Sequence, residues 1–147
     1  MSSNLSYALI MTAAGIGIPV LAAMNAALGQ KIGSPVTAAA VLFTVAVLAA
    51  WGLAAAFGFQ GMSKLAIAPK YLFLAGVLVL FYVLSITFVA PKFGVGNAVF
   101  FVLVGQIISA ALIDHFGLFG ATVTQISVSR AIGLGMMVGG IGLTRLT

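Results

Sequence analysis

The sequence contains no cysteine, one acidic residue and one histidine. The absence of cysteine excludes disulfides and thiolate metal sites. Because Asp114 is the only acid and His115 the only histidine, the chain has too few ligands for a metal site of its own and no set of residues for a catalytic triad. We therefore expect no enzyme activity, no metal and no cofactor.

Charge of either sign is also scarce. Charged residues make up 5% of the 147 residues, hydrophobic residues make up 63%, and the mean hydropathy is +1.32. Water cannot solvate the surface of such a chain, so the composition predicts an integral membrane protein. The net charge of +5 comes from basic residues that stand singly between apolar stretches. This pattern is typical of anchors to lipid headgroups, and we expect no nucleic-acid partner.

The apolar stretches predict an all-α membrane protein with five transmembrane helices in a single domain, residues 1–147, since a span needs roughly 20 residues. Ser34 is the predicted N-cap of the second helix, with Pro35 at its first position. Pro91 to Gly94 predict a tight turn before the fourth helix. The predicted helices cover residues 7–28, 35–57, 70–89, 96–113 and 128–144.

The basic residues divide evenly between the two sides of the membrane that five spans define. They are Lys64, Lys70 and Arg130 on the amino-terminal side, and Lys31, Lys92 and Arg145 on the other. Because the Lys and Arg bias of short loops sets orientation, an even division lets both orientations coexist, and oppositely oriented copies can then pair. The alternative is that a weak bias, such as the free amino terminus, still selects one orientation.

A few polar side chains fall within the predicted spans, where each needs a partner, a cavity or a functional reason. The candidates for a substrate cavity are Asn25, Tyr82, Ser85 and Gln106. Gln106 could instead join two helices, and the hydroxyls of Tyr82 and Ser85 could bond to their own helix. Asn97 is interpreted as the cap of the fourth helix. A cavity lined by amides and hydroxyls predicts a neutral or zwitterionic small-molecule substrate.

Small residues indicate where membrane helices approach closely. Gly135, Gly139 and Gly142 fall at steps of four and three in the last helix, so they predict a dimer interface or, alternatively, packing within the chain. The first helix has a similar face, predicted to point inward, made of Gly15, Ala22, Ala26 and Gly29 with Pro19 among them.

The single acid and the single histidine are adjacent. Asp114 follows Gly96 by about one membrane thickness, which places it at the boundary where water solvates it. His115 projects about 100° away from it on a helix, a poor arrangement for a proton relay. We predict that the pair marks the exit of the fourth helix, with a proton-coupling role as the alternative.

The stretch FYVLSITFVAPKFGVGNAVFFVLVGQIISA, Phe81 to Ala110, resembles the second-to-third helix passage of small multidrug resistance transporters. The glycine-rich last helix resembles their dimerising fourth helix. With AAMNAALGQKIGSP and DHFGLFG included, nearly the whole chain is more similar to the YdcZ-like family of proposed inner-membrane exporters in the drug/metabolite transporter superfamily. The most specific motifs are Asn25 to Pro35 and Gly105 to Gly120.

The resemblance implies a multi-pass protein of the bacterial inner membrane. Larger members of the superfamily contain two five-helix repeats, which implies that this chain works as an inverted pair and agrees with the division of basic residues. One departure concerns the first helix, where small multidrug resistance transporters carry a glutamate that binds cations and exchanges protons. Here that helix offers only Asn25, so proton-coupled export of cationic drugs by that mechanism is in doubt.

Together these features predict a small transporter that moves a metabolite by alternating access in an antiparallel dimer of ten helices. The partner is an identical chain or a paralogue. The alternative is a non-transporting subunit that scaffolds or regulates a larger membrane complex, in which the polar residues only hold helices together.

Overall fold

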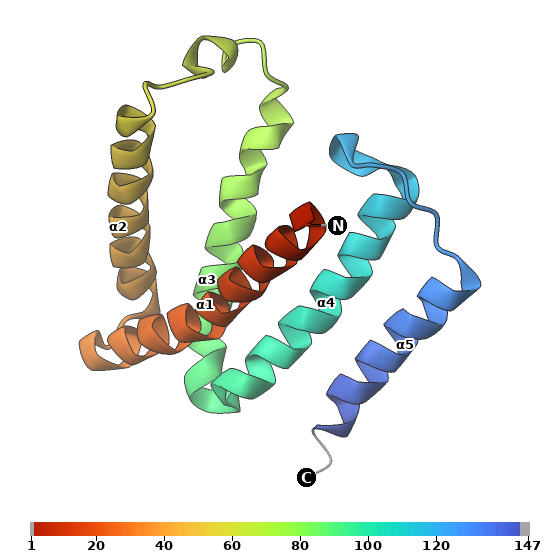
Figure 1. Cartoon of the computed structure of the whole chain (residues 1–147). Helices are drawn as coiled ribbons and strands as arrows, with labels where there is room; N and C mark the ends of the chain where they lie inside the picture. The colour runs from red at the N-terminus through yellow and green to blue at the C-terminus, as the bar shows by residue number, and fades with distance from the viewer. Residues whose placement is uncertain (1, 145–147) are drawn as a thin grey trace. The chain divides into compact units, whose positions relative to one another are not determined.

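The computed structural model describes residues 2–144, with side chains from Asn4 onward. This part of the chain is folded into helices joined by turns and short 3-10 segments, and it contains no strand (Figure 1). The predicted all-α class is therefore confirmed. Arg145, one of the basic residues counted for orientation, lies outside the described residues. The five α-helices are α1 (Ser2–Ile32), α2 (Pro35–Ala56), α3 (Ala75–Phe93), α4 (Val95–Phe116) and α5 (Val128–Leu143).

The chain divides into two compact units, one ending at Val95 and the other beginning at Gly96. The first unit holds α1, α2 and α3, and the second holds α4 and α5. The single domain expected from the sequence stays a prediction, and each unit is described by itself.

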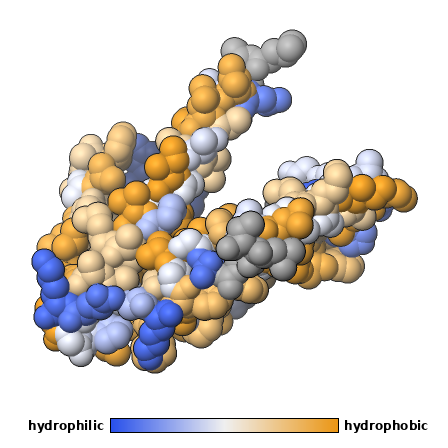
Figure 2. Space-filling model, turned by 90° about the horizontal axis from the view of Figure 1, so that it is seen from below, coloured by the Kyte–Doolittle hydropathy of each residue, from blue (hydrophilic) through white to orange (hydrophobic). Residues whose placement is uncertain are grey.

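Four segments of the described residues are long and apolar enough to cross a membrane. They are Asn4–Ile32, Pro35–Ala56, Lys70–Phe93 and Val95–Phe116. The fifth helix, α5, has 16 residues, which at about 1.5 Å per residue is shorter than the roughly 30 Å of a hydrocarbon core. Large apolar side chains lie on the surface of every helix, and Figure 2 shows apolar colour over most of the visible face. Such a surface requires lipid or protein around it.

The starts of two helices agree with the sequence. Ser34 lies in extended geometry before α2, its side chain accepts a hydrogen bond from the Thr37 amide at 3.1 Å, and Pro35 is the first helical residue. Ser127 does the same for α5, accepting from the Arg130 amide at 3.2 Å. Both hydroxyls satisfy amides that have no partner within the helix. The predicted cap at Ser34 is confirmed.

The predicted turn over Pro91 to Gly94 is wrong at its start. Pro91 lies in the last turn of α3, which continues to Phe93, and only Gly94 leaves the helix, with φ of +89°. A proline at position 91 removes one amide hydrogen bond, the one to the Thr87 carbonyl. The helix nevertheless continues for two more residues, to Phe93. The interpretation of Asn97 as a cap is also wrong, because α4 already begins at Val95.

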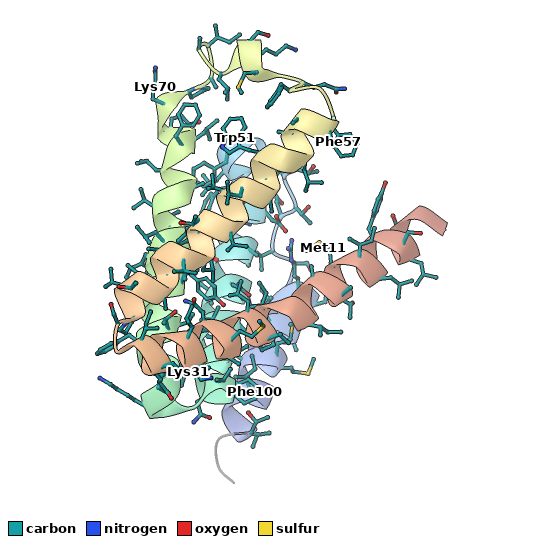
Figure 3. All side chains as sticks on the ribbon, turned by 90° about the vertical axis from the view of Figure 1, so that its left-hand side faces the viewer. Met11, Lys31, Trp51, Phe57, Lys70 and Phe100 are labelled. Atoms are coloured by element: carbon teal, nitrogen blue, oxygen red, sulfur yellow. The ribbon has the colours of Figure 1, made fainter. Side chains whose placement is uncertain are left out.

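Helix α1 crosses α2 and α3 in the first unit, and this crossing is where the chain is best buried. Figure 3 shows Lys31 at the end of α1 near the crossing, whereas Phe57 and Lys70 lie toward the other end of α2 and α3. The residues buried there are mostly small, namely Ala22, Ala26, Ala38, Ala39 and Ala90, with Val83 and Ile86 on α3. Small side chains allow the close backbone approach that holds membrane helices together.

Candidate functional site

The helix crossing of the first unit is tightest around Gly29 of α1. A Cβ atom on Gly29 would lie 3.1 Å from the Cγ2 atom of Thr87 and 3.4 Å from the Cα atom of Pro35. Ala22 and Ala26 are buried on the same face, whereas Gly15 is exposed and would have nothing within 4 Å of an added Cβ. The inward face predicted for this helix is therefore correct from Ala22 onward, and it does not extend to Gly15.

Asn25 lies at this crossing and is hydrogen-bonded to another helix. Its amide nitrogen, Nδ2, lies 2.6 Å from the Oγ1 atom of Thr87 on α3. The Thr87 hydroxyl in turn donates to the backbone carbonyl of Val83, also at 2.6 Å. Asn25 is 4% exposed and Thr87 is 1% exposed, so both side chains are largely removed from solvent, and the amide nitrogen is paired with the hydroxyl oxygen. This chain of two hydrogen bonds is the most deeply buried polar feature of the described residues.

Asn25 also borders an open apolar groove on the seam between α1 and α2. The groove has a volume of about 480 Å³, and its other lining residues are Leu21, Met24 and Leu28 of α1 with Val41, Leu42 and Val45 of α2. Asn25 is the only polar side chain among these lining residues. A mostly apolar cavity with one well-placed polar group is the usual form of a small-molecule site.

The other two site residues predicted in the first unit, Tyr82 and Ser85, lie on α3 and are half-buried. The hydroxyl oxygen of Tyr82 is enclosed, yet it has no hydrogen-bond partner among the described residues. Such a group calls for a partner that the chain does not supply. The hydrogen bonds of Asn25 lead to Thr87 and not to Tyr82 or Ser85. Whether these two line a cavity with Asn25 stays a prediction.

Gln106, the fourth predicted site residue, belongs to the second unit and is exposed on α4. Its neighbour Ser109 is bonded to its own helix, donating to the carbonyls of Gly105 at 2.9 Å and Gln106 at 3.2 Å. A serine bonded in this way is satisfied without a partner helix. Of these two polar residues, Gln106 is therefore the one whose side chain is available for a contact outside α4.

Asp114 and His115 hold the connection between α4 and α5. After Gly117 the chain turns back, and the irregular segment 121–127 passes beside the end of α4. The amide of Thr124 donates to the backbone carbonyl of Asp114 at 2.9 Å, and the amide of Ile126 donates to the Nδ1 atom of His115 at 3.1 Å. These bonds satisfy backbone groups that have no helical partner.

Arg130, in the first turn of α5, completes this connection. Its Nη2 atom lies 2.5 Å from the Oδ2 atom of Asp114, and its Nη1 atom donates to the Thr124 carbonyl at 3.1 Å. We name Asp114, His115, Thr124, Ile126 and Arg130 the α4–α5 clamp. Asp114 and His115 therefore have a structural role, in addition to their predicted place where the fourth helix leaves the membrane. Their hydrogen-bond partners are Arg130, Thr124 and Ile126.

The glycines predicted as a dimer interface lie along α5. An added Cβ on Gly135, Gly139 or Gly142 would meet nothing within 4 Å in the described chain. Gly142 also borders a small groove of about 180 Å³, lined in addition by Phe100, Phe101 and Val104 of α4 and by Val138 and Ile141 of α5. The glycine face is thus open within its unit, and its use as an interface stays a prediction.

Thr87 is the functional candidate that sequence reasoning missed. A signal was available in the distances from the basic residues that end α1 and α3. Asn25 stands six residues before Lys31, and Thr87 stands five residues before Lys92. Because Lys31 and Lys92 are expected on the same side of the membrane, these spacings place the amide and the hydroxyl at a similar depth, where each can satisfy the other.

A comparison with protein families finds one match that covers most of the chain. The family described as "Putative inner membrane exporter, YdcZ" matches residues 6–143. This range includes Asn25, Thr87, the groove, the α4–α5 clamp and the glycine face of α5. Comparisons with curated proteins and with solved structures give no match.

Proposed function

Since the chain belongs to the YdcZ family of inner membrane exporters, we propose that it moves a small neutral or zwitterionic metabolite across that membrane by alternating access. The protein is a multi-pass protein of the inner membrane, and membership of this family points away from an enzyme. Its proposed substrate site contains the groove beside Asn25, with Tyr82 and Ser85 of the same unit as further polar contacts. Gln106 of the second unit is proposed as a substrate contact on its own.

The observation that carries this proposal is the position of Asn25. A buried amide in a membrane helix is costly unless it is paired, and Asn25 is paired while it also borders an apolar groove. A groove that held only lipid chains would have no use for a polar group in its wall. The absence of an acid from the described spans, apart from Asp114 at the end of α4, favours an uncharged or zwitterionic solute over a cation.

We further propose that the working form is an antiparallel dimer. The even division of basic residues gives neither orientation an advantage. Two open surfaces remain available for a second copy, the groove between α1 and α2 and the glycine face of α5. Two oppositely oriented copies would then exchange conformations around a shared site, as inverted repeats do within larger transporters. An identical chain or a paralogue would serve equally well as the partner.

A second candidate function is that of a non-transporting subunit in a larger membrane complex. The open glycine face of α5 favours it, because another protein could pack there as readily as a second copy of this chain. In that case the Asn25 to Thr87 bond would only hold α1 to α3.

Flux measurements on purified protein in liposomes separate these two functions. The probes are radiolabelled neutral amino acids and polyols, tested with the wild type and with Asn25→Ala and Gln106→Ala variants whose dimer is shown to be intact. We expect flux of at least one probe, lowered roughly tenfold or more in each variant, since each removes a polar contact in an apolar site. Thr44→Val is the matched control, because within the described residues the Thr44 hydroxyl is bonded only to the Ala40 carbonyl of its own helix.

Unchanged flux in Asn25→Ala would remove Asn25 from the substrate site. Absence of flux for every probe, together with persistent co-purification of a larger membrane protein, would support the subunit function instead.

A further inference from the structure

We infer that Thr87 fixes the orientation of the Asn25 amide so that its carbonyl oxygen is left for the ligand, and that the groove therefore selects solutes that carry an N–H or O–H donor. This inference deepens the proposed function and rests on it.

The Thr87 proton is committed to its own helix. Its Oγ1 atom lies 2.6 Å from the carbonyl oxygen of Val83, and a contact of that length between two oxygens requires a proton between them. The Val83 carbonyl has none, so the hydroxyl must donate. Toward Asn25, also 2.6 Å away, the Thr87 oxygen can then act only as an acceptor.

This constraint decides which end of the amide faces Thr87. An asparagine carries a donor at Nδ2 and an acceptor at Oδ1, and only Nδ2 can pair with an oxygen that must accept. A flipped amide would place two acceptors against each other in a site where Thr87 is 1% exposed. That arrangement would leave a buried polar group unsatisfied and is strongly disfavoured.

The Oδ1 atom is consequently the free end of the amide. It forms no hydrogen bond with any residue in the described part of the chain. It is also absent from the fully enclosed polar atoms without a partner, of which the Tyr82 hydroxyl is the only one in that part. Because Asn25 borders the groove between α1 and α2 while its nitrogen faces α3, the carbonyl oxygen is the acceptor that this groove can use.

A single hydrogen-bond acceptor in an apolar groove selects ligands that carry a hydrogen-bond donor. An alcohol, amine or amide N–H gains a hydrogen bond there, whereas an ether of the same shape leaves the oxygen without a partner. The difference amounts to about two- to tenfold in affinity for a neutral hydrogen bond. Carboxylates and phosphates, which only accept, are disfavoured by the same oxygen. In this scheme Thr87 is a positioning residue, since it acts on the ligand through Asn25.

The test uses cyclohexanol and oxepane, a donor-bearing probe and a donor-free cyclic ether of the same molecular formula. Both are titrated into the full-length protein in lipid nanodiscs, with asparagine labelled by an NMR-active nitrogen. Only three asparagines occur, Asn4, Asn25 and Asn97, so the side-chain signal of Asn25 is assigned with one substitution. We expect cyclohexanol to bind up to about tenfold more tightly than the ether and to shift the Asn25 signal.

Thr87→Val removes the acceptor for Nδ2 while preserving side-chain shape, so the amide is free to rotate. The preference for cyclohexanol should fall to about even, and the Asn25 signal should move before any probe is added. Thr87→Ser keeps a hydroxyl and should keep the preference. Thr44→Val should also keep it, because Thr44 donates to the Ala40 carbonyl as Thr87 does to Val83 but contacts no asparagine.

Equal affinity of the wild type for the two probes would overturn the inference, and this comparison requires no variant to fold. A Thr87→Val protein that keeps both the preference and the Asn25 signal would overturn it as well. Flux in liposomes is measured separately. A preference for cyclohexanol without flux of any solute would uphold the binding inference and reject transport, whereas flux without the preference would uphold transport and reject the inference.

Discussion

Arg130 joins the start of α5 to Asp114, near the end of α4, through a contact of 2.5 Å between Nη2 and Oδ2. The same guanidinium donates to the Thr124 carbonyl. One side chain therefore holds both the helix α4 and the irregular segment 121–127 that follows it. A planar group with several donors can reach two acceptors at once, which a lysine cannot do with the same geometry.

Removal of Arg130 should cost more than removal of its acidic partner. Asp114→Asn loses one partly exposed ion pair, worth about 0.5–1 kcal/mol, whereas Arg130→Gln also frees the Thr124 carbonyl and should cost on the order of 1–2 kcal/mol. Thermal unfolding in detergent micelles measures both. Lys64→Gln is the matched control, because it removes a basic residue that forms no ion pair with any of residues 2–144. Equal stability of Arg130→Gln and Lys64→Gln would contradict the clamp.

His115 should protect the Ile126 amide from hydrogen exchange. Its Nδ1 atom accepts a hydrogen bond from that amide, and a hydrogen-bonded amide exchanges more slowly than a free one. His115→Leu should speed exchange at Ile126, and His115→Asn, whose side-chain oxygen can replace Nδ1, should preserve much of the protection.

The amide of Thr124 is the internal reference for this measurement, because it donates to the backbone carbonyl of Asp114 and not to a side chain. Exchange rates of the variants and the wild type are compared at one pH. Parallel loss of protection at Thr124 and Ile126 in His115→Leu would show that the substitution opens the whole segment, and it would contradict the specific role of His115.

An alanine at Gly29 should destabilise the first unit, whereas an alanine at Gly15 should not. The added Cβ at Gly29 would lie 3.1 Å from the Cγ2 atom of Thr87, which two hydrogen bonds hold in place. At Gly15 nothing lies within 4 Å, so the usual gain of about 0.5–1 kcal/mol from replacing glycine in a helix applies. Thermal unfolding gives both values, and a Gly29→Ala protein as stable as Gly15→Ala would show that the crossing is looser than described.

Local signals in the sequence predicted the starts of α2 and α5 well. Ser34 with Pro35, and Ser127 before α5, act through hydrogen bonds between residues three apart, which neighbouring sequence determines. Pro91 was misjudged because the cost of a proline depends on how much helix follows it, and here only two further helical residues do. Its effect is therefore set by the position of the helix end, which Gly94 determines.

The candidate site was only partly predictable for a different reason. Asn25 was recognisable as a polar group in an apolar helix, but its partner Thr87 is 62 residues away in sequence, and a threonine in a membrane helix is commonly satisfied by its own backbone. Thr87 forms that local bond and the long-range one together. The contacts of Asp114 and His115 were likewise hidden, because they depend on segment 121–127 turning back along α4.

We propose that one chain inserts in both orientations and works as an opposed pair. Since the chain has no cysteine, a single cysteine can be placed at Lys31 in one variant and at Lys64 in another. Each is labelled with a membrane-impermeant maleimide from outside intact cells, with lysed cells as the reference for full labelling. We expect comparable partial labelling at the two positions, and labelling at only one of them would contradict the claim.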